Sequence, residues 1–303
     1  MRQEDFDDPT LISSKVAVIV TTYNHSQFVR STLDSVLSQS TDFDFQVVVY
    51  DDYSTDGTQE ILKDFKSKFP SQVLLMLSQE NQFSLGRDTT IVALQKINSK
   101  YIAFCEGDDI WLSKDKLQRQ FNFMEENESW CSISHHDVDL IESNGGDWIT
   151  RHLHREFWVR DRRVRGRNLI NGNFIYTCSV MIRRAALRND FLSKINGRQP
   201  GDYLIFSQAC EQGDIGYLKG VSSGYRIHSA NMWAGSDDDS RNQLTLEARE
   251  FLASNLLPPL SQEFREFIRT GLRIKDKMHV RIMRFFRFRV FQLVHLFLGR
   301  IEK

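Results

Sequence analysis

Three acidic residues follow an apolar stretch in the segment YIAFCEGDDIW, which covers residues 101–111. They are Glu106, Asp108 and Asp109, and the aromatic Trp111 comes almost directly after them. Carboxylates that crowd together repel one another unless they share a cation. The segment is therefore either a turn that happens to be acidic or a binding site for a positive ion.

Polar residues also follow two other apolar runs. Residues 21–24 (Thr, Thr, Tyr, Asn) follow the run at 16–20, and Asp51 and Asp52 end the segment FQVVVYDD. Each group alone suits an ordinary turn, because Asp and Asn favour turns and helix caps. In an open parallel sheet, however, ligands bind where the carboxyl ends of the strands meet. Three such groups predict a site for a metal and a diphosphate, with Tyr23 and Asp52 available for a nucleobase.

The elements that must position these residues alternate between strand and helix. Apolar runs at 16–20, 45–52, 73–78 and 101–105 predict buried strands, and the segments between them have apolar residues at helical spacing, the last at 87–99. This alternation predicts an α/β fold with a mostly parallel central sheet and helices on both sides. Further on, 130–150 and 173–183 are predicted as strands, 201–212 as a helix and 222–233 as a strand that enters a loop. The chain beyond about residue 240 is predicted to be helical.

Composition narrows the class of protein. The 303 residues are 41% hydrophobic, which suits a sizeable core, and the formal net charge of −1 gives no field that would attract nucleic acid. No apolar run reaches the about 18 to 20 residues that span a bilayer. The N-terminus lacks a signal-peptide pattern, and the four cysteines form no C-x-x-C pair, so a reducing cytoplasmic compartment is expected.

Two common phosphate-binding motifs are missing. The sequence has no G-x-x-x-x-G-K-[ST], and no G-x-G-x-x-G follows the first strand. The expected site is therefore neither a P-loop nor a dinucleotide-cofactor site.

Three blocks carry a resemblance to a known family. VAVIVTTYNHSQFVRSTLDSVLSQS, VVVYDDYSTDGT and YIAFCEGDD resemble, in order and spacing, the blocks of the family 2 inverting glycosyltransferases, which have the GT-A fold. The resemblance runs from about residue 15 to about 230. It implies the transfer of a sugar, a hexose for example, from a nucleotide sugar to an acceptor hydroxyl with inversion, and UDP is the expected nucleotide.

The resemblance assigns residues to the nucleotide. Thr21 and Tyr23 would line the nucleoside pocket, and Asp52 would bind the base. Arg87, in LGRDTT, matches a basic residue that approaches the nucleotide. Asp108, which matches the D-x-D region, would lie beside the diphosphate.

It also assigns the metal and the catalytic base. Asp108 and Asp109 would hold Mg²⁺ or Mn²⁺, with Glu106 where many members have aspartate, so its contact with the metal is left open. Asp202, in PGDYLIF, would be the catalytic base, although this chain has glycine before it where many relatives have glutamate. His228, in YRIHSANMW, matches a position near the diphosphate or the metal.

Other interpretations of these residues remain. Asp202 on its own suits a helix N-cap, His228 a loop histidine and Tyr23 a core aromatic. Asp137 and Asp139 border the donor sugar or form a turn. Zinc is not expected at Cys131, His135 and His136, because adjacent residues of a strand point to opposite faces.

Other functions are also open. A nucleotidyltransferase or a non-catalytic nucleotide-sugar binder would use a related site, whereas a glycoside hydrolase would need two opposed carboxyls and no nucleotide pocket.

The resemblance and the composition give three segments. Residues 1–14 are an acidic segment, and 15–240 form the GT-A domain, with a nucleotide-binding half at about 15–110 and an acceptor half at about 111–240. Residues 241–303 form a helical extension that is basic and aromatic towards its end.

Two basic segments are candidates for binding an acceptor or a membrane. The arginine-rich stretch 151–167 is a solvated surface or binds a phosphate-bearing acceptor. The tail from residue 279 either packs on the domain or lies on an anionic membrane. Together with this tail, the family resemblance implies a peripheral enzyme at the cytoplasmic face of the inner membrane. It would act on a saccharide or lipid-linked saccharide in lipopolysaccharide, O-antigen or capsule assembly.

Overall fold

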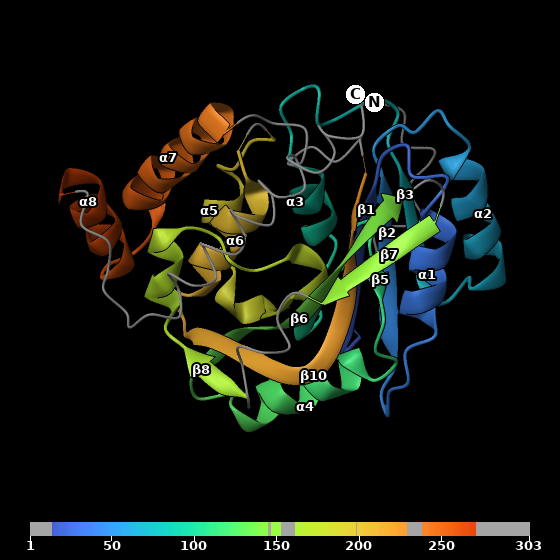
Figure 1. Cartoon of the computed structure of the whole chain (residues 1–303), viewed down its shortest axis with the longest axis horizontal. Coiled ribbons are helices and arrows are strands. Elements are labelled where there is room, and N and C mark those ends of the chain that lie inside the picture. The colour runs from blue at the N-terminus through green and yellow to red at the C-terminus, as the bar shows by residue number, and fades with distance from the viewer. Residues whose placement is uncertain (1–13, 145–146, 153–160, 198, 229–237, 271–303) are drawn as a thin grey trace.

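The computed structural model describes residues 14–144, 147–152, 161–197, 199–228 and 238–270 (Figure 1). The acidic segment before residue 14 and the basic tail from residue 271 lie outside the described residues, and so does the predicted membrane contact of that tail.

The first half is built from four parallel strands in the order β3-β2-β1-β4. Their bounds are β1 Val16–Thr22, β2 Phe45–Asp51, β3 Val73–Leu77 and β4 Tyr101–Phe104. The connecting helices are α1 Val29–Leu37, α2 Thr58–Lys68 and α3 Thr89–Leu94. Strands of β-branched and aromatic residues suit this position because they are buried on both faces.

Alternate residues of β1 serve two separate cores. Val18 packs with Leu33 of α1 and Leu62 of α2, whereas Ile19 packs with Leu94 of α3. Figure 1 accordingly shows α1 and α2 on one side of the strands and α3 on the other. The predicted α/β fold with helices on both sides of a mostly parallel sheet is confirmed.

The second half extends the same sheet with strands of both directions, in the order β4-β9-β6-β10-β5. Two long strands, β6 and β10, pair in parallel, and β9 lies antiparallel between β4 and β6. The bounds are β5 Ile110–Trp111, β6 Cys131–Asn144, β7 Asp147–His152, β8 Arg162–Val164, β9 Met181–Arg183 and β10 Asp214–Ile227. Figure 1 shows β10 as a long curved strand that starts beside β8.

The remaining helices flank this half. They are α4 Lys116–Glu126, α5 Asn189–Leu192, α6 Gly201–Ala209, α7 Asp238–Asn255 and α8 Leu260–Thr270, with short 3-10 turns at Gly166–Asn171, Thr177–Ser179 and Arg184–Ala186. Leu252 of α7 and Phe264 of α8 are buried in the same core as Phe206 of α6. The described part of the predicted helical extension therefore packs on the domain. No helix among the described residues is long and apolar enough to cross a membrane.

Several predicted bounds are wrong. β1 continues to Thr22, so Thr21 lies within the strand and does not follow it. The helix predicted at 87–99 covers only Thr89–Leu94, and Ile97 lies outside this helix although it is buried in the same core. In the stretch 173–183 only the last three residues form a strand, after a 3-10 turn.

Candidate active site

The loops after β2 and β4 meet at the carboxyl end of β1. The backbone N–H of Asp52 donates to the carbonyl oxygen of Thr22 at 2.9 Å, and that of Gly107 donates to the carbonyl oxygen of Thr21 at 2.8 Å. Because β1 lies between β2 and β4, its last two residues bring the predicted base-binding loop and the predicted metal-binding loop together.

Asp52 is buried in the predicted nucleoside region. Its carboxylate accepts hydrogen bonds from the backbone N–H of Gln82 at 2.6 Å and of Phe83 at 3.0 Å, so it fixes the loop after β3. Burial raises the pKa of Asp52 above its ordinary value. The exposed side chain of Arg87 donates to Gln82 Oε1 at 2.6 Å, and the ring of Tyr23 is 48% exposed, so Tyr23 is not a core aromatic.

Glu106, Asp108 and Asp109 form a group that we call the acidic cluster. Each offers a carboxylate oxygen, and these oxygens lie within 4.8 Å of one another. Burial and the nearby charge of Asp108 raise the pKa of Glu106 to about 8, and burial with both neighbours raises the pKa of Asp109 well above its usual range. A divalent cation would relieve this repulsion, and hard oxygen donors suit Mg²⁺ or Mn²⁺. The residues present therefore fit such an ion.

Two histidines flank Asp108. Its Oδ2 lies 3.0 Å from Nε2 of His228 and 3.7 Å from Nε2 of His25. Burial alone would raise the pKa of Asp108, but the hydrogen bond with His228 and the nearby His25 hold that pKa below its ordinary value. His228 was predicted in this region, and Phe28 stacks on its ring with 4.6 Å between ring centroids. His25 was missed, although it stands directly after the polar residues 21–24.

Arg226 connects the end of β10 to the acidic cluster. Its Nη1 donates to the carbonyl oxygens of Asp108 at 2.9 Å and Asp109 at 3.1 Å, and its backbone N–H donates to Asp109 Oδ1 at 3.1 Å. Sequence reasoning missed Arg226 too. The available signal was its spacing from His228, since residues two apart in an extended strand share a face.

Asp202 lies in the first turn of α6, one residue inside the helix. The N-cap is Pro200, so the interpretation of Asp202 as a cap residue is wrong. Its Oδ2 accepts a hydrogen bond from Asn173 Nδ2 at 2.7 Å. The negative charge of Asp202 contributes to the raised pKa of Glu106, which places Asp202 within electrostatic reach of the acidic cluster.

The carboxylate of Asp88 explains why the residue before Asp202 is glycine. A Cβ on Gly201 would overlap the carboxylate of Asp88, so no larger residue fits at 201 without movement of Asp88. Asp88 caps α3 through a hydrogen bond from the N–H of Ile91, at 3.1 Å. Burial, with a smaller contribution from Asp202, raises the pKa of Asp88 to about 6.

With this geometry established, the comparisons with known proteins identify the family. The sequence profile described as Glycosyl transferase family 2 matches residues 17–191, more than half of the chain. The chain belongs to glycosyl transferase family 2.

Similar proteins agree with this membership. An uncharacterised protein of Mycobacterium tuberculosis is 28% identical over 231 residues, which are 75% of this chain and 62% of that protein. The putative teichuronic acid biosynthesis glycosyltransferase TuaG of Bacillus subtilis is 34% identical over 131 residues, which are 43% of this chain and 49% of TuaG.

A solved structure shows the same fold. Staphylococcus aureus TarS 1-349, in complex with UDP-GlcNAc, superposes with a TM-score of 0.63 at 20% identity. The match covers 89% of this chain and 78% of that one. The GT-A architecture predicted for this family 2 chain is thus confirmed.

Other polar residues of β6 have partners in the core. Asp137 Oδ1 accepts a hydrogen bond from the hydroxyl of Tyr217 at 2.7 Å, and the Nδ1 of His136 lies 2.8 Å from the carbonyl oxygen of Asp137. Asp137 and Asp139 are buried within the strand, so the interpretation of these residues as a turn is wrong.

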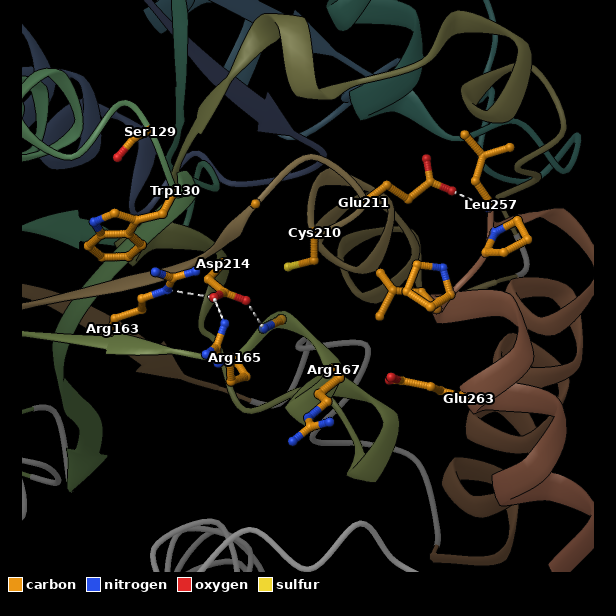
Figure 2. A pocket seen from close by; sticks show the side chains of 15 residues that line it. Ser129, Trp130, Arg163, Arg165, Arg167, Cys210, Glu211, Asp214, Leu257 and Glu263 are labelled. Carbon is orange, nitrogen blue, oxygen red and sulfur yellow. Dashed lines mark hydrogen bonds and ion pairs between the residues drawn. The ribbon is translucent and has the colours of Figure 1, made fainter.

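Residues 161–167 of the arginine-rich stretch lie beside the start of β10, whereas residues 151 and 152 end β7. Asp214 accepts hydrogen bonds from Arg163 Nε at 2.6 Å, Arg165 Nη1 at 3.1 Å and the N–H of Gly166 at 2.9 Å. These residues line a cavity of about 470 Å³, and residues 257–259 of the turn between α7 and α8 line its opposite side (Figure 2). Because Arg226 stands at the other end of β10, Arg163 and Arg165 do not border the acidic cluster. Residues 153–160 lie outside the described residues.

Proposed function

We propose that this protein is an inverting glycosyltransferase that moves a sugar from a UDP-sugar to an acceptor hydroxyl. The observation that carries the proposal is the acidic cluster beside the end of β1, with Asp202 of α6 within electrostatic reach of it. Membership of family 2 supports sugar transfer, and the UDP-GlcNAc complex of TarS supports a UDP-linked donor.

The donor would lie across the carboxyl ends of β1, β2 and β4. Thr21, Tyr23 and Asp52 border the nucleoside, and Arg87 approaches it from the loop after β3. Asp108 and Asp109 of the acidic cluster would hold the divalent cation, with Glu106 and His228 beside them. When bound, Mg²⁺ or Mn²⁺ would neutralise the charge that develops on the departing diphosphate.

The chain's own residues perform the proton transfer. The acceptor oxygen attacks the anomeric carbon from the face opposite the diphosphate, and Asp202 accepts the proton of the acceptor hydroxyl. The bond between the anomeric carbon and the diphosphate oxygen breaks, and UDP leaves with its electron pair. Asn173 Nδ2 donates to Oδ2 of Asp202 at 2.7 Å and the Tyr203 N–H donates to Oδ1 at 2.7 Å, so these two bonds orient the carboxylate.

The names of similar proteins support a role in surface polysaccharide synthesis. TuaG is named for teichuronic acid, and TarS for the transfer of N-acetylglucosamine to poly(ribitol-phosphate). We infer an acceptor of the same broad kind, a saccharide or a lipid-linked saccharide. Peripheral attachment through the basic tail at the cytoplasmic face remains part of this proposal.

A panel of donors tests the proposal. The purified chain is incubated with Mn²⁺ and single UDP-, GDP- or CDP-sugars, with and without a mixture of lipid-linked saccharides, and released nucleoside diphosphate is measured. We expect release of UDP from at least one UDP-sugar, and none after EDTA treatment. Synthesis of a nucleotide sugar from UTP and a sugar phosphate, or binding of a UDP-sugar without turnover of any donor, would contradict it.

A further inference from the structure

Tyr53 has a backbone conformation that bulky residues rarely adopt. Its φ is 67°, and only Asn24 shares a positive φ among the non-glycine residues that the structure describes. Asn tolerates the left-handed region because its short side chain bonds locally, whereas an aromatic residue there is strained. Such strain persists where the surrounding structure holds it, and it concentrates at ligand sites.

The hydrogen bonds that hold Tyr53 also place it beside Tyr23. The N–H of Asp52 donates to the carbonyl oxygen of Thr22 at 2.9 Å, and the N–H of Asn24 donates to Ser54 Oγ at 2.8 Å. The loops after β1 and β2 are therefore bonded to each other on both sides of the two tyrosines. The β1–β2 register, in which Thr22 lies opposite Asp51, continues with Tyr53 opposite Asn24, one residue beyond Tyr23.

Both rings face solvent next to the buried carboxylate of Asp52. Tyr23 is 48% exposed and Tyr53 is 47% exposed, in a chain whose other described tyrosines are largely covered. Phe83, whose N–H donates to Asp52, is a third exposed ring at 42%. Large apolar side chains gathered at one exposed place mark a binding surface.

Resting on the proposed function, we propose that Tyr53 is a second stacking residue for the nucleobase of the donor, beside Tyr23. Aromatic side chains bind every base through its π-face, so stacking adds affinity without choosing the base. This role explains why a strained residue stands at position 53. Stacking needs an aromatic ring there, and the hydrogen bonds between the two loops hold the strained backbone.

Three substitutions separate the ring from the backbone. Tyr53→Gly removes the ring and suits the positive φ, and Tyr53→Asn removes the ring but keeps a side chain that tolerates this conformation. Tyr53→Phe keeps both the ring and the strain. We expect the first two to melt no lower than the wild type, because they relieve the backbone, while both lose nucleotide affinity.

The ligands are UDP and inorganic pyrophosphate, each with Mn²⁺, measured by calorimetry. Because stacking involves only the base, Tyr53→Gly and Tyr53→Asn should weaken UDP about tenfold and leave pyrophosphate unchanged. Tyr53→Phe should bind UDP within about twofold of the wild type.

The outcomes distinguish this inference from the function that it rests on. If the wild type binds UDP but Tyr53→Gly binds it equally well, the stacking role is wrong and the proposed function stands. The same holds if pyrophosphate weakens as much as UDP, or if Tyr53→Phe loses as much affinity as Tyr53→Gly. A wild type that binds neither UDP nor any other nucleotide overturns both.

Discussion

Carboxylates and arginines lie near both ends of β10, but arginines outnumber carboxylates at its start and carboxylates outnumber arginines near its end. At its start, one carboxylate, Asp214, accepts from two arginines and a backbone N–H. Near its end, the three carboxylates of the acidic cluster lie close to one another, and the guanidinium of Arg226 donates to the main-chain carbonyl oxygens of Asp108 and Asp109.

This difference separates a structural cluster from a functional one. A partly buried carboxylate that is fully hydrogen-bonded stabilises the fold, whereas buried carboxylates that crowd together cost stability until a cation joins them. In the acidic cluster two histidines hold the pKa of Asp108 low, but the pKa values of Glu106 and Asp109 are raised. Arg163, Arg165 and the cavity beside them therefore belong to the architecture of the second half, and the acidic cluster belongs to the chemistry. Single substitutions at the two ends should have opposite consequences.

The largest expected effect is on catalysis. Asp202→Asn keeps the size of the side chain and removes the base, so kcat should fall about a thousandfold. The affinity for UDP, measured by calorimetry, should stay within about twofold of the wild type, because Asp202 acts on the acceptor. Asp214→Asn is the matched control, and its kcat should be unchanged. Equal losses of kcat in both variants would remove the distinction between the two ends.

The next effect is on stability at the start of β10. Asp214→Asn weakens bonds to two guanidinium groups and a backbone N–H at a side chain that is only 14% exposed. The free energy of unfolding in urea should fall by about 2 kcal/mol. Nucleotide affinity is the second readout and should not change. A variant as stable as the wild type would show that the hydrogen bonds of Asp214 do not stabilise the fold, and the proposed difference between the two ends would be wrong.

An effect of the opposite sign is expected in the acidic cluster. The pKa of Glu106 is about 8 in the folded protein against an ordinary value of 4.5, so the folded state holds the proton more tightly than the unfolded state. The contribution of Glu106 to stability without metal is therefore fully present below pH 4.5 and is lost as the pH rises through about 8.

Glu106→Gln cannot ionise and removes that decrease. In EDTA at pH 8, the free energy of unfolding of this variant should exceed that of the wild type by about 4 kcal/mol, and the difference should become small near pH 4.5. Urea titrations at several pH values measure it. A loss of stability at pH 8 would mean that the charge of Glu106 is already compensated.

The sequence predicted the first half of the fold better than the second because its signals are local. The apolar runs and helical spacing of 16–104 lie within single elements, and β1 to β4 follow them to within a few residues. The second half depends on pairing between distant segments. β9 keeps only three residues of the predicted stretch because its partners are β4 and β6, which no local pattern reveals.

The candidate site divides in the same way. Asp108, Asp109 and Asp202 stand in sequence motifs, so the family resemblance is enough to indicate them. His25, Asp88 and Arg226 enter through contacts between loops far apart in sequence. The overlap between a side chain at 201 and Asp88, for example, links α6 to α3 and leaves no periodic signal.

The central claim is that the acidic cluster binds a nucleoside diphosphate through a divalent cation. Calorimetric titration of UDP into the wild type and Asp108→Asn, each in Mn²⁺ and in EDTA, tests it most directly. The account predicts that Mn²⁺ strengthens UDP binding to the wild type about tenfold or more, and that Asp108→Asn loses this gain. Equal affinity in Mn²⁺ and EDTA, or a full gain in Asp108→Asn, would contradict it.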